Sequence, residues 1–253
     1  MTELKNTLQR KKLKVLLIGD NCTDVYQYGT VDRLSPEAPV PVFVPTHKEE
    51  RPGMAGNVYN NLVALGCDVD LVSGLLSKKT RLIDVRSKQH LLRIDEDVKT
   101  VPLKYLDTTG YDGVVISDYN KGLISYEFIR QIINSRLPVF IDTKKTELEN
   151  MQGAWVKINE LEYSKIKSEC SGLIVTRGDK GAEVMNEEYV SPAPRVEVVD
   201  VTGAGDTFLS ALAYNYLKTY DIKQSVDFAV RASSITVQHL GCYAPTLEEI
   251  NAT

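Results

Sequence analysis

One glycine-rich stretch, DVTGAGDTF over residues 200–208, strongly constrains what this chain can fold into. Before it, residues 195–199 are rich in β-branched side chains and predict a short strand. After it, residues 207–220 have the apolar spacing of an amphipathic helix. The glycines therefore stand where a strand turns into a helix, and they let backbone N–H groups approach a ligand closely. Because a helix N-terminus offers unpaired N–H groups and a positive dipole end, the stretch predicts an anion site.

Asp206 places a carboxylate within one turn of this predicted anion site. A carboxylate repels phosphate, so its natural role there is that of a base for a hydroxyl that attacks a phosphorus atom. The structural alternative is that Asp206 only complements the helix dipole and that Thr202 is an ordinary N-cap. On local physics alone the two interpretations are evenly balanced.

The run DVTGAGDTFLSALA resembles the C-terminal motif of the PfkB carbohydrate kinases, in the ribokinase superfamily. The resemblance implies that Asp206 is the catalytic base and that the amides of Gly203, Ala204 and Gly205 hold the transferred phosphoryl group. It also implies ATP and Mg²⁺ as cofactors, with a monovalent cation as a further option. The implied fold is an α/β three-layer sandwich of the ribokinase type, with a mostly parallel central sheet and a small β-lid.

Length and composition agree with one enzyme domain. The chain has 253 residues, 43% of them apolar, and a net charge of −4 without a long single-sign block. We expect residues 1–253 to form a single kinase domain, without a nucleic-acid-binding surface or a membrane span. The four cysteines have no paired spacing, which favours buried thiols in a reducing cytosol. The basic start, residues 1–14, lacks the apolar run of a signal peptide, so we expect a cytoplasmic protein.

Two stretches near the N-terminus carry candidate acceptor-binding residues. Residues 13–18 predict a fully buried first strand, and Asp24 lies beyond its carboxyl end, where α/β sheets bind ligands. Residues 51–57 then lead to a predicted helix over 58–65, and the Asn57 amide can donate to and accept from sugar hydroxyls. Turn chemistry explains Asp24 by itself, and an N-cap explains Asn57 equally well.

Two further stretches predict a lid. Prolines at positions 36, 39, 41 and 45 suit edge strands and turns, so residues 25–50 predict a small β-excursion. Residues 69–73 predict a second buried strand, and residues 81–95 alternate around a polar turn like a hairpin. Because exposed strand edges often pair with another copy, we expect a homodimer through this lid.

The span from Gly19 to Asn57 resembles the kinase domain of the heptose-7-phosphate kinase/ADP-heptose synthase proteins, most specifically in the run SPEAPVPV over 35–42. The resemblance implies that Asp24, Gly53 and Asn57 face the sugar, with Arg51 beside it.

Two features depart from that pattern. Met54 stands where the family has the second of two adjacent glycines, and its thioether side chain changes the space for a sugar. Between residues 76 and 80 the chain lacks a helix and a strand of the family. We expect part of one sheet face to be thin or covered by a partner subunit. The segment after Glu162 is also shorter than in relatives.

Lys121 belongs to the run DYNKG over 118–122, which follows a predicted buried strand over 113–117 and resembles a heptose-kinase motif. An ammonium is a compact charge that suits the acceptor's own phosphate, so Lys121 is a candidate ligand for it. A solvated loop lysine is an alternative of at least equal weight.

Asn159 and Glu162 follow a predicted strand over 155–158 and face the same side of a helix start. Such a pair suits Mg²⁺ held through water, and the Asn-x-x-Glu motif of the family implies this role for both residues. The alternative is a capped surface helix with an acidic first turn.

The resemblance implies the nucleotide site as well. Its residues follow the strand at 173–176, flank the glycine-rich turn, or lie in a predicted helix over 225–239. The implied contacts are Asn159, Arg177, Gly178, Thr202, Ala232 and Ser233.

These observations predict ATP-dependent phosphorylation of a sugar hydroxyl. The resemblance favours D-glycero-D-manno-heptose 7-phosphate as acceptor, phosphorylated at C1, and only that first step, since no nucleotidyltransferase domain follows. One alternative is a PfkB kinase for another sugar, sugar phosphate or nucleoside. The other is a non-catalytic sugar- or nucleotide-binding protein that kept the fold.

Overall fold

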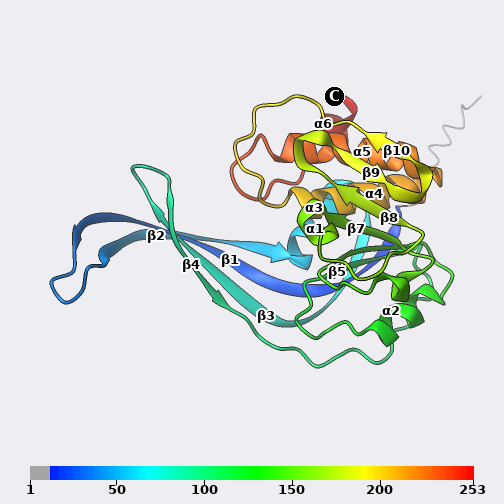
Figure 1. Ribbon diagram of the computed structural model, residues 1–253, viewed down its shortest axis with the longest axis horizontal. Helices are drawn as coiled ribbons and strands as arrows, with labels where there is room; N and C mark the ends of the chain where they lie inside the picture. The colour runs from blue at the N-terminus through cyan, green and yellow to red at the C-terminus, as the bar shows by residue number, and fades with distance from the viewer. Residues whose placement is uncertain (1–11) are drawn as a thin grey trace, which may run out of the picture.

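The structure is a computed structural model that describes residues 12–253, so most of the basic start at 1–14 lies outside the described residues. A single ten-stranded sheet forms the middle layer, with helices packed on both of its faces (Figure 1). The strands are β1 Lys14–Leu34, β2 Pro41–Met54, β3 Asp68–Asp84, β4 His90–Glu96, β5 Gly113–Asp118, β6 Val139–Thr143, β7 Trp155–Asn159, β8 Leu173–Thr176, β9 Ala182–Val184 and β10 Tyr189–Ser191. The α-helices are α1 Ala55–Ala64, α2 Tyr126–Ile133, α3 Glu160–Tyr163, α4 Ala204–Thr219, α5 Ile222–Thr236 and α6 Leu247–Asn251.

The sheet has the order β10-β9-β8-β7-β6-β5-β1-β3-β4, and β2 pairs with the outer part of β1. Neighbours from β8 to β3 run parallel, while β4, β9 and β10 add antiparallel edges. Parallel strands with helices on both faces are buried throughout, and every residue of β5 is buried. The expected three-layer α/β sandwich with a mostly parallel sheet is confirmed.

Two hydrophobic clusters lie on the two faces of this sheet. Val15 and Leu17 belong to the cluster under α1, α4 and α5, whereas Leu16 and Ile18 belong to the cluster under α2. The alternation follows from the two-residue period of a strand. No helix within residues 12–253 is long and apolar enough to cross a membrane. Three of the four cysteines are buried, and all four are free thiols.

The lid is built by strands that leave the body without a break. β1 was expected to end at Ile18 but continues to Leu34, where β2 and the outer part of β3 replace the body strands as its partners. Residues 69–73 were expected to form a second buried strand. They instead begin β3, which is only partly buried and runs on to Asp84. The chain thus passes directly from the body into the lid along one continuous strand, part of the arm seen in Figure 1.

The coil over residues 97–112 covers part of the face that was expected to be thin. Leu103 and Leu106 pack against the cluster under α2, and the Leu103 N–H donates to Leu123 O at 2.9 Å. Leu75 and Leu76 nearby on β3 remain 63% and 55% exposed. The chain therefore covers this face only in part.

Residues 195–199 were expected to form a strand, but they are coil. Their backbone bonds to the end of a helix and not to a neighbouring strand. The Val199 N–H donates to Val237 O at 2.8 Å, at the C-terminal end of α5. β-branched residues fit this extended coil as well as they fit a strand, so local composition did not separate the two.

Two helices begin earlier than the sequence pattern predicted. The first turn of α4 already contains Asp206, because the helix starts at Ala204 behind Gly203, whose φ of 81° is left-handed. Gly203 is the N-cap, so Thr202 does not cap this helix. α1 starts at Ala55 behind Met54, so Asn57 is a helical residue and not the cap.

Candidate active site

The carboxylate of Asp206 lies at the N-terminal end of α4 and is 7% exposed. The Asn57 side chain donates to its Oδ2 at 2.8 Å, from α1, and the Tyr119 hydroxyl donates to its Oδ1 at 3.4 Å. Asn57 was expected to face the sugar, yet here its amide nitrogen contacts the candidate base. These two donors fix both oxygens of one carboxylate in the first turn of a helix.

Burial raises the pKa of Asp206 to about 6, although the bond from Asn57 acts in the opposite direction. A carboxyl with this pKa is mostly ionised at pH 7 and binds a proton more readily than an ordinary aspartate. That combination suits a general base. The negative charge of Asp206 in turn raises the pKa of Tyr119 well above its usual value, so the phenol keeps its proton and remains a donor.

The glycines before Asp206 permit close approach. A side chain at Gly203 would meet the Asn57 amide nitrogen at 2.8 Å and the Cys242 sulfur at 3.2 Å. A side chain at Gly205 would meet the Lys157 Nζ at 2.8 Å. The amides of residues 203–205 therefore lie at a crowded helix start where an anion can be bound by backbone donors.

Lys157 is a buried cation beside this helix start. Lys157 lies in the middle of β7 and is 4% exposed. Its ammonium pairs with Asp142 on β6 at 2.8 Å. Burial lowers the pKa of Lys157, but Asp142 outweighs burial and the net shift is upward, so the ammonium is charged. The other oxygen of Asp142 is buried without a hydrogen-bond partner among the described residues. A fixed positive charge thus lies next to Gly205, and the paired oxygen of Asp142 lies 3.8 Å from a side chain built at the same position.

Several of the residues that were predicted to contact the acceptor lie at the lid. Asp24 on β1 is paired with Arg81 on β3 at 2.5 Å, and both side chains are largely buried. Gly53 is packed so closely that a side chain there would meet Asp24 Oδ2 at 2.2 Å. Arg51 on β2 donates to Glu49 at 2.8 Å and to Leu240 O at 3.4 Å. The structure thus brings Asp24, Gly53 and Arg51 together at the base of the lid.

Lys121 lies in the loop after β5 and its ammonium is paired with Asp97. Its backbone N–H, like that of Tyr119, donates to Asp20 Oδ2, at 3.2 and 2.9 Å respectively. The loop is therefore fixed by a buried carboxylate at the end of the body part of β1.

Asn159 and Glu162 form a reciprocal capping box at the start of α3, with both bonds at 2.8 Å, and Glu162 is also paired with Lys144. The capped-helix alternative thus describes the geometry found. No group of three or more metal-binding side chains occurs among residues 12–253. Mg²⁺ usually takes one or two carboxylates and completes its shell with water and phosphate oxygens. Glu162 and the unpartnered oxygen of Asp142 fit that limited donor set.

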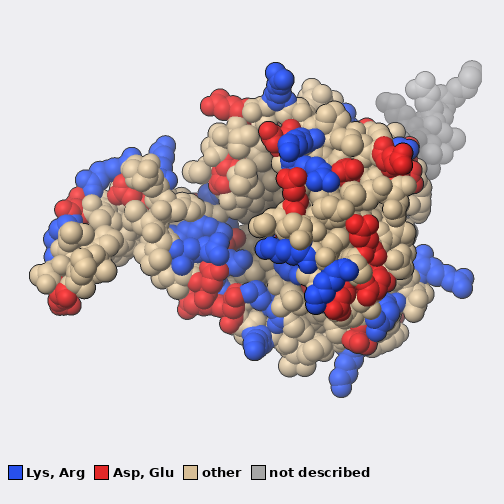
Figure 2. All heavy atoms as spheres, viewed as in Figure 1, with Lys and Arg blue, Asp and Glu red and all other residues tan. Residues whose placement is uncertain are grey.

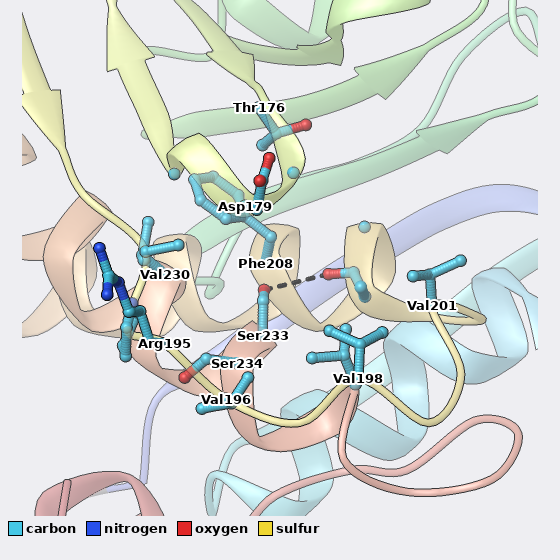
Figure 3. A pocket seen from close by; sticks show the side chains of 17 residues that line it. Thr176, Asp179, Arg195, Val196, Val198, Val201, Phe208, Val230, Ser233 and Ser234 are labelled. Carbon is cyan, nitrogen blue, oxygen red and sulfur yellow. Dashed lines mark hydrogen bonds between the residues drawn. The ribbon is translucent and has the colours of Figure 1, made fainter.

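A cavity of about 570 Å³ borders the start of α4 at Ala204 and Gly205 (Figure 3). Apolar side chains from the coil 195–201 and from α4 and α5 make most of its wall, and Ser233 lies on its floor with its hydroxyl donating to Ala204 O at 3.1 Å. The lining includes Gly178, Val196, Val198, Val201, Ala204, Gly205, Phe208, Val230, Ser233 and Val237. Such a size and lining suit a flat heteroaromatic group with a phosphate tail reaching Gly205.

The other predicted nucleotide contacts have different surroundings. Arg177 pairs with Glu183 at 2.7 Å and Glu160 at 3.1 Å. The Thr202 hydroxyl donates to Asp200 at 2.7 Å. Ala232 is fully buried in the cluster under α4 and α5, whereas its neighbour Ser233 lines the cavity.

Sequence reasoning assigned no role to Lys157, Asp142, Tyr119, Arg81 or Cys242. Lys157 carried a usable signal, because it is a charge within the otherwise apolar run 155–158. The Tyr119 contact to Asp206 joins residues 87 positions apart, and no local pattern encodes it.

Comparison with known proteins agrees with this geometry. The model of the pfkB family carbohydrate kinases matches residues 137–250. Bifunctional protein HldE of Nitratiruptor sp. is 35% identical over 301 residues, covering 94% of this chain and 64% of that protein. The C-terminal part of this chain, residues 137–250, is therefore similar to the pfkB family of carbohydrate kinases. The expected enzyme class, a carbohydrate kinase, agrees with this family match.

Other relatives set the limits of this likeness. Bifunctional protein HldE of Aliarcobacter butzleri is 29% identical and covers 95% of this chain and 64% of that protein. The chain thus spans just under two thirds of these relatives. The 301 aligned residues of the Nitratiruptor protein exceed the 253 of this chain, so that pfkB relative contains segments that this chain lacks.

Solved structures confirm the ribokinase-like fold. Arabidopsis thaliana ribokinase, complexed with ribose and ATP, has a TM-score of 0.73 at 16% identity and covers 95% of this chain and 98% of its own. Thermotoga maritima ribokinase has a TM-score of 0.71 at 19% identity, with the same two coverages.

Proposed function

We propose that this protein transfers the γ-phosphoryl group of ATP to a sugar hydroxyl, with Asp206 as the general base. The observation that carries the proposal is the position of Asp206. It is a buried carboxylate with a pKa of about 6, held by Asn57 in the first turn of α4, between an apolar cavity and the charged base of the lid.

Asp206 accepts the proton of the acceptor hydroxyl as its oxygen attacks the γ-phosphorus. The bond from that phosphorus to the oxygen shared with the β-phosphate breaks, and ADP leaves. The negative charge of the transferring group grows next to Gly205, where the amides of 203–205 and the Lys157 ammonium lie. Fixed donors at the place where charge develops are the main source of catalysis in phosphoryl transfer.

The nucleotide base is proposed to occupy the cavity at Ser233, with its phosphates directed to the α4 start. Arg177, Gly178, Thr202 and Ala232 remain proposed neighbours of the nucleotide, on the resemblance. Glu162, Asn159 and the free oxygen of Asp142 would hold Mg²⁺, which neutralises charge on the nucleotide phosphates when bound.

The acceptor is proposed to lie between the lid and Asp206, against Asp24, Gly53, Asn57 and Arg51. A heptose 7-phosphate is the preferred candidate, on the resemblance of residues 19–57 to heptose kinases. Another sugar, sugar phosphate or nucleoside is the second candidate, because Met54 occupies a glycine position. Lys121 stays a proposed contact to the acceptor phosphate.

Two companion proposals concern the whole molecule. A homodimer through the lid is supported by the exposed apolar side chains Leu34, Val40 and Val44. A monomer mass in light scattering at working concentration would contradict it. A cytoplasmic location remains a prediction from the sequence.

The test is ADP release from Mg²⁺-ATP with a small acceptor panel of heptose 7-phosphate, fructose 6-phosphate, fructose, ribose and adenosine. Each acceptor is run with the wild type and with Asp206→Asn, which keeps the shape but removes the base. We expect turnover on one acceptor that falls roughly 10²–10⁴-fold in the variant while ATP still binds. ATP binding without turnover on any acceptor would favour the non-catalytic binding protein instead.

A further inference from the structure

The lid strands carry a row of charged side chains on one face. In register, Asp24 on β1 stands opposite Arg51 on β2 and beside Lys79 on β3, and Lys79 stands opposite Asp95 on β4. Paired residues on neighbouring strands share a face of the sheet. This is the face of Asp24, so it borders the proposed acceptor space. Figure 2 shows basic and acidic groups side by side along the lid and near its junction with the body.

The cations on this face are almost all neutralised by neighbours. Arg81 pairs with Asp24 at 2.5 Å, Arg51 with Glu49 at 2.8 Å and Arg93 with Asp95 at 2.9 Å, and Lys121 pairs with Asp97.

Lys79 is the exception. Within residues 12–253, no carboxylate oxygen lies within the 4.0 Å that defines an ion pair for its ammonium. Its recorded contact is the ring of Tyr119, whose centroid is 5.4 Å from Nζ. The side chain is half-buried. The register thus leaves one uncompensated positive charge on the acceptor face, next to Asp24.

Tyr119 relates this charge to the reaction centre. Its ring contacts Lys79, and its hydroxyl donates to Asp206. The ring therefore separates the free ammonium from the base, so a group bound at Lys79 is distinct from the hydroxyl that loses its proton. The Lys144 ammonium also lies 5.4 Å from this ring, but it is paired with Glu162. Lys79 does not line the nucleotide cavity.

We propose that Lys79 binds a phosphate monoester carried by the acceptor, and that it is the residue that selects phosphorylated over neutral sugars. The inference rests on the proposed function. A compact ammonium without a partner is suited to a phosphate oxygen, and charge-assisted bonds of this kind are about twice as strong as neutral ones. Lys121, whose charge is already shared with Asp97, is at most a second and weaker contact.

The test compares Lys79→Met with Lys78→Met. The two lysines are adjacent on β3 but point to opposite faces, and Lys78 is paired with the exposed Glu96 at 3.2 Å, which makes it a matched control. Steady-state kinetics with heptose 7-phosphate and unphosphorylated heptose give KM and kcat for each variant. We expect Lys79→Met to raise the KM for the phosphorylated sugar roughly 10–100-fold, with little change for the neutral sugar or for ATP. Lys79→Arg should recover most of the loss, and Lys78→Met should match the wild type.

Direct binding separates this inference from the kinase proposal. Calorimetric titration of heptose 7-phosphate into Asp206→Asn, with and without Lys79→Met, needs no turnover. A weaker affinity in the double variant supports the subsite even when every kinetic assay is silent. An unchanged KM and affinity in Lys79→Met would overturn it while leaving the kinase intact. An equal rise in KM for both sugars, or a rise for ATP alone, would also overturn it.

Discussion

The cavity proposed for the nucleotide and the lid surface proposed for the acceptor differ in the chemistry of their linings. The cavity wall is mostly aliphatic, with Val196, Val198, Val201, Val230 and Val237 contributed by a coil and by α5. The acceptor side is a sheet surface on which ion pairs such as Asp24–Arg81 and Arg51–Glu49 follow one another along the strands. One ligand therefore meets apolar surface and the other meets charge.

The difference teaches where specificity is encoded. An apolar cavity selects by shape, and one methylene more or less changes affinity only modestly. Paired charges reject a wrong partner strongly, because a buried charge that loses its partner is costly. The departures expected from the heptose-kinase pattern, at Met54 and near residue 76, also lie in the lid strands β2 and β3. We therefore expect changes in substrate choice to arise in the lid.

Lys157 belongs to neither region, and its removal should have a larger effect than any change within the two regions. We expect Lys157→Met to lower kcat roughly 10²–10³-fold, because a fixed cation next to Gly205 is lost where charge develops. Both KM values should change much less. The measurement is steady-state kinetics with each substrate varied in turn.

The control for Lys157→Met addresses the buried charge that it leaves on Asp142. Breaking a buried pair on one side costs about 3–5 kcal/mol of stability, whereas the double variant Asp142→Asn/Lys157→Met stays neutral. We expect the double variant to unfold near the wild-type temperature and to remain slow. Recovery of turnover in the double variant would mean that Lys157 only stabilises the fold.

Val198→Asp tests whether the cavity holds the nucleotide. Val198 lines the cavity and is 58% exposed, so the change adds a charge without disturbing the core. The new carboxylate repels the nucleotide phosphates and wets an apolar wall, and we expect the KM for ATP to rise roughly tenfold. The acceptor KM should stay constant, the reverse of Lys79→Met. Val190→Asp on β10, 57% exposed and outside the cavity, is the matched control. If acceptor KM rises instead, the cavity does not hold the nucleotide.

The centre of the site was largely predictable from sequence, for a physical reason. Gly203, Gly205 and Asp206 lie in a local turn and in the first turn of one helix, so short-range chemistry encodes their position. Asn57 illustrates what local chemistry omits. Its residue type was noted, but its bond to Asp206 depends on the packing of α1 against α4, 149 positions away. Lys157 likewise lies next to Gly205 only through tertiary packing, because the two residues belong to separate elements, β7 and α4.

The fold was predictable in class and less so in its strand lengths. Alternating buried strands and helices required a parallel sheet with helices on both faces. The pair Gly19-Asp20 looked like the end of a strand, yet β1 continues through it because β2 and β3 supply new backbone partners. The coil 195–199 shows the converse, since its β-branched residues do not pair with a neighbouring strand. Both outcomes depend on tertiary partners that no local pattern specifies.

The pH dependence of kcat/KM tests how the surroundings of Asp206 set its pKa. Because Asp206 must be ionised to accept a proton, kcat/KM should rise with pH and level off above its pKa of about 6. Its bond from Asn57 lowers that pKa, so Asn57→Ala should move the acid limb upward by on the order of one pH unit. Asn60→Ala, an exposed residue of the same helix, is the control. Superimposable profiles for all three proteins would remove Asn57 from this role.

Stability should respond to pH in the opposite direction to activity. The folded pKa of Asp206 lies above its usual value of 3.8, so folding favours the protonated form. The stabilising contribution is therefore complete at low pH and is lost as the pH rises through about 6.

The smallest effect concerns the two helix starts that meet at the site. α4 begins behind Gly203 with φ 81°, whereas α1 begins behind Met54 with φ 52° and ψ −128°, a region that favours glycine. Met54 is also 4% exposed, so Met54→Gly both relieves the backbone and loses buried surface. Met54→Ala loses nearly the same surface but keeps the backbone cost. We expect the glycine variant to be more stable than the alanine variant by about 1 kcal/mol in urea unfolding, the reverse of the order found at ordinary positions. If the alanine variant is the more stable, the positive φ at position 54 carries no cost in folding free energy. The start of α1 is then no more constrained than the start of α4.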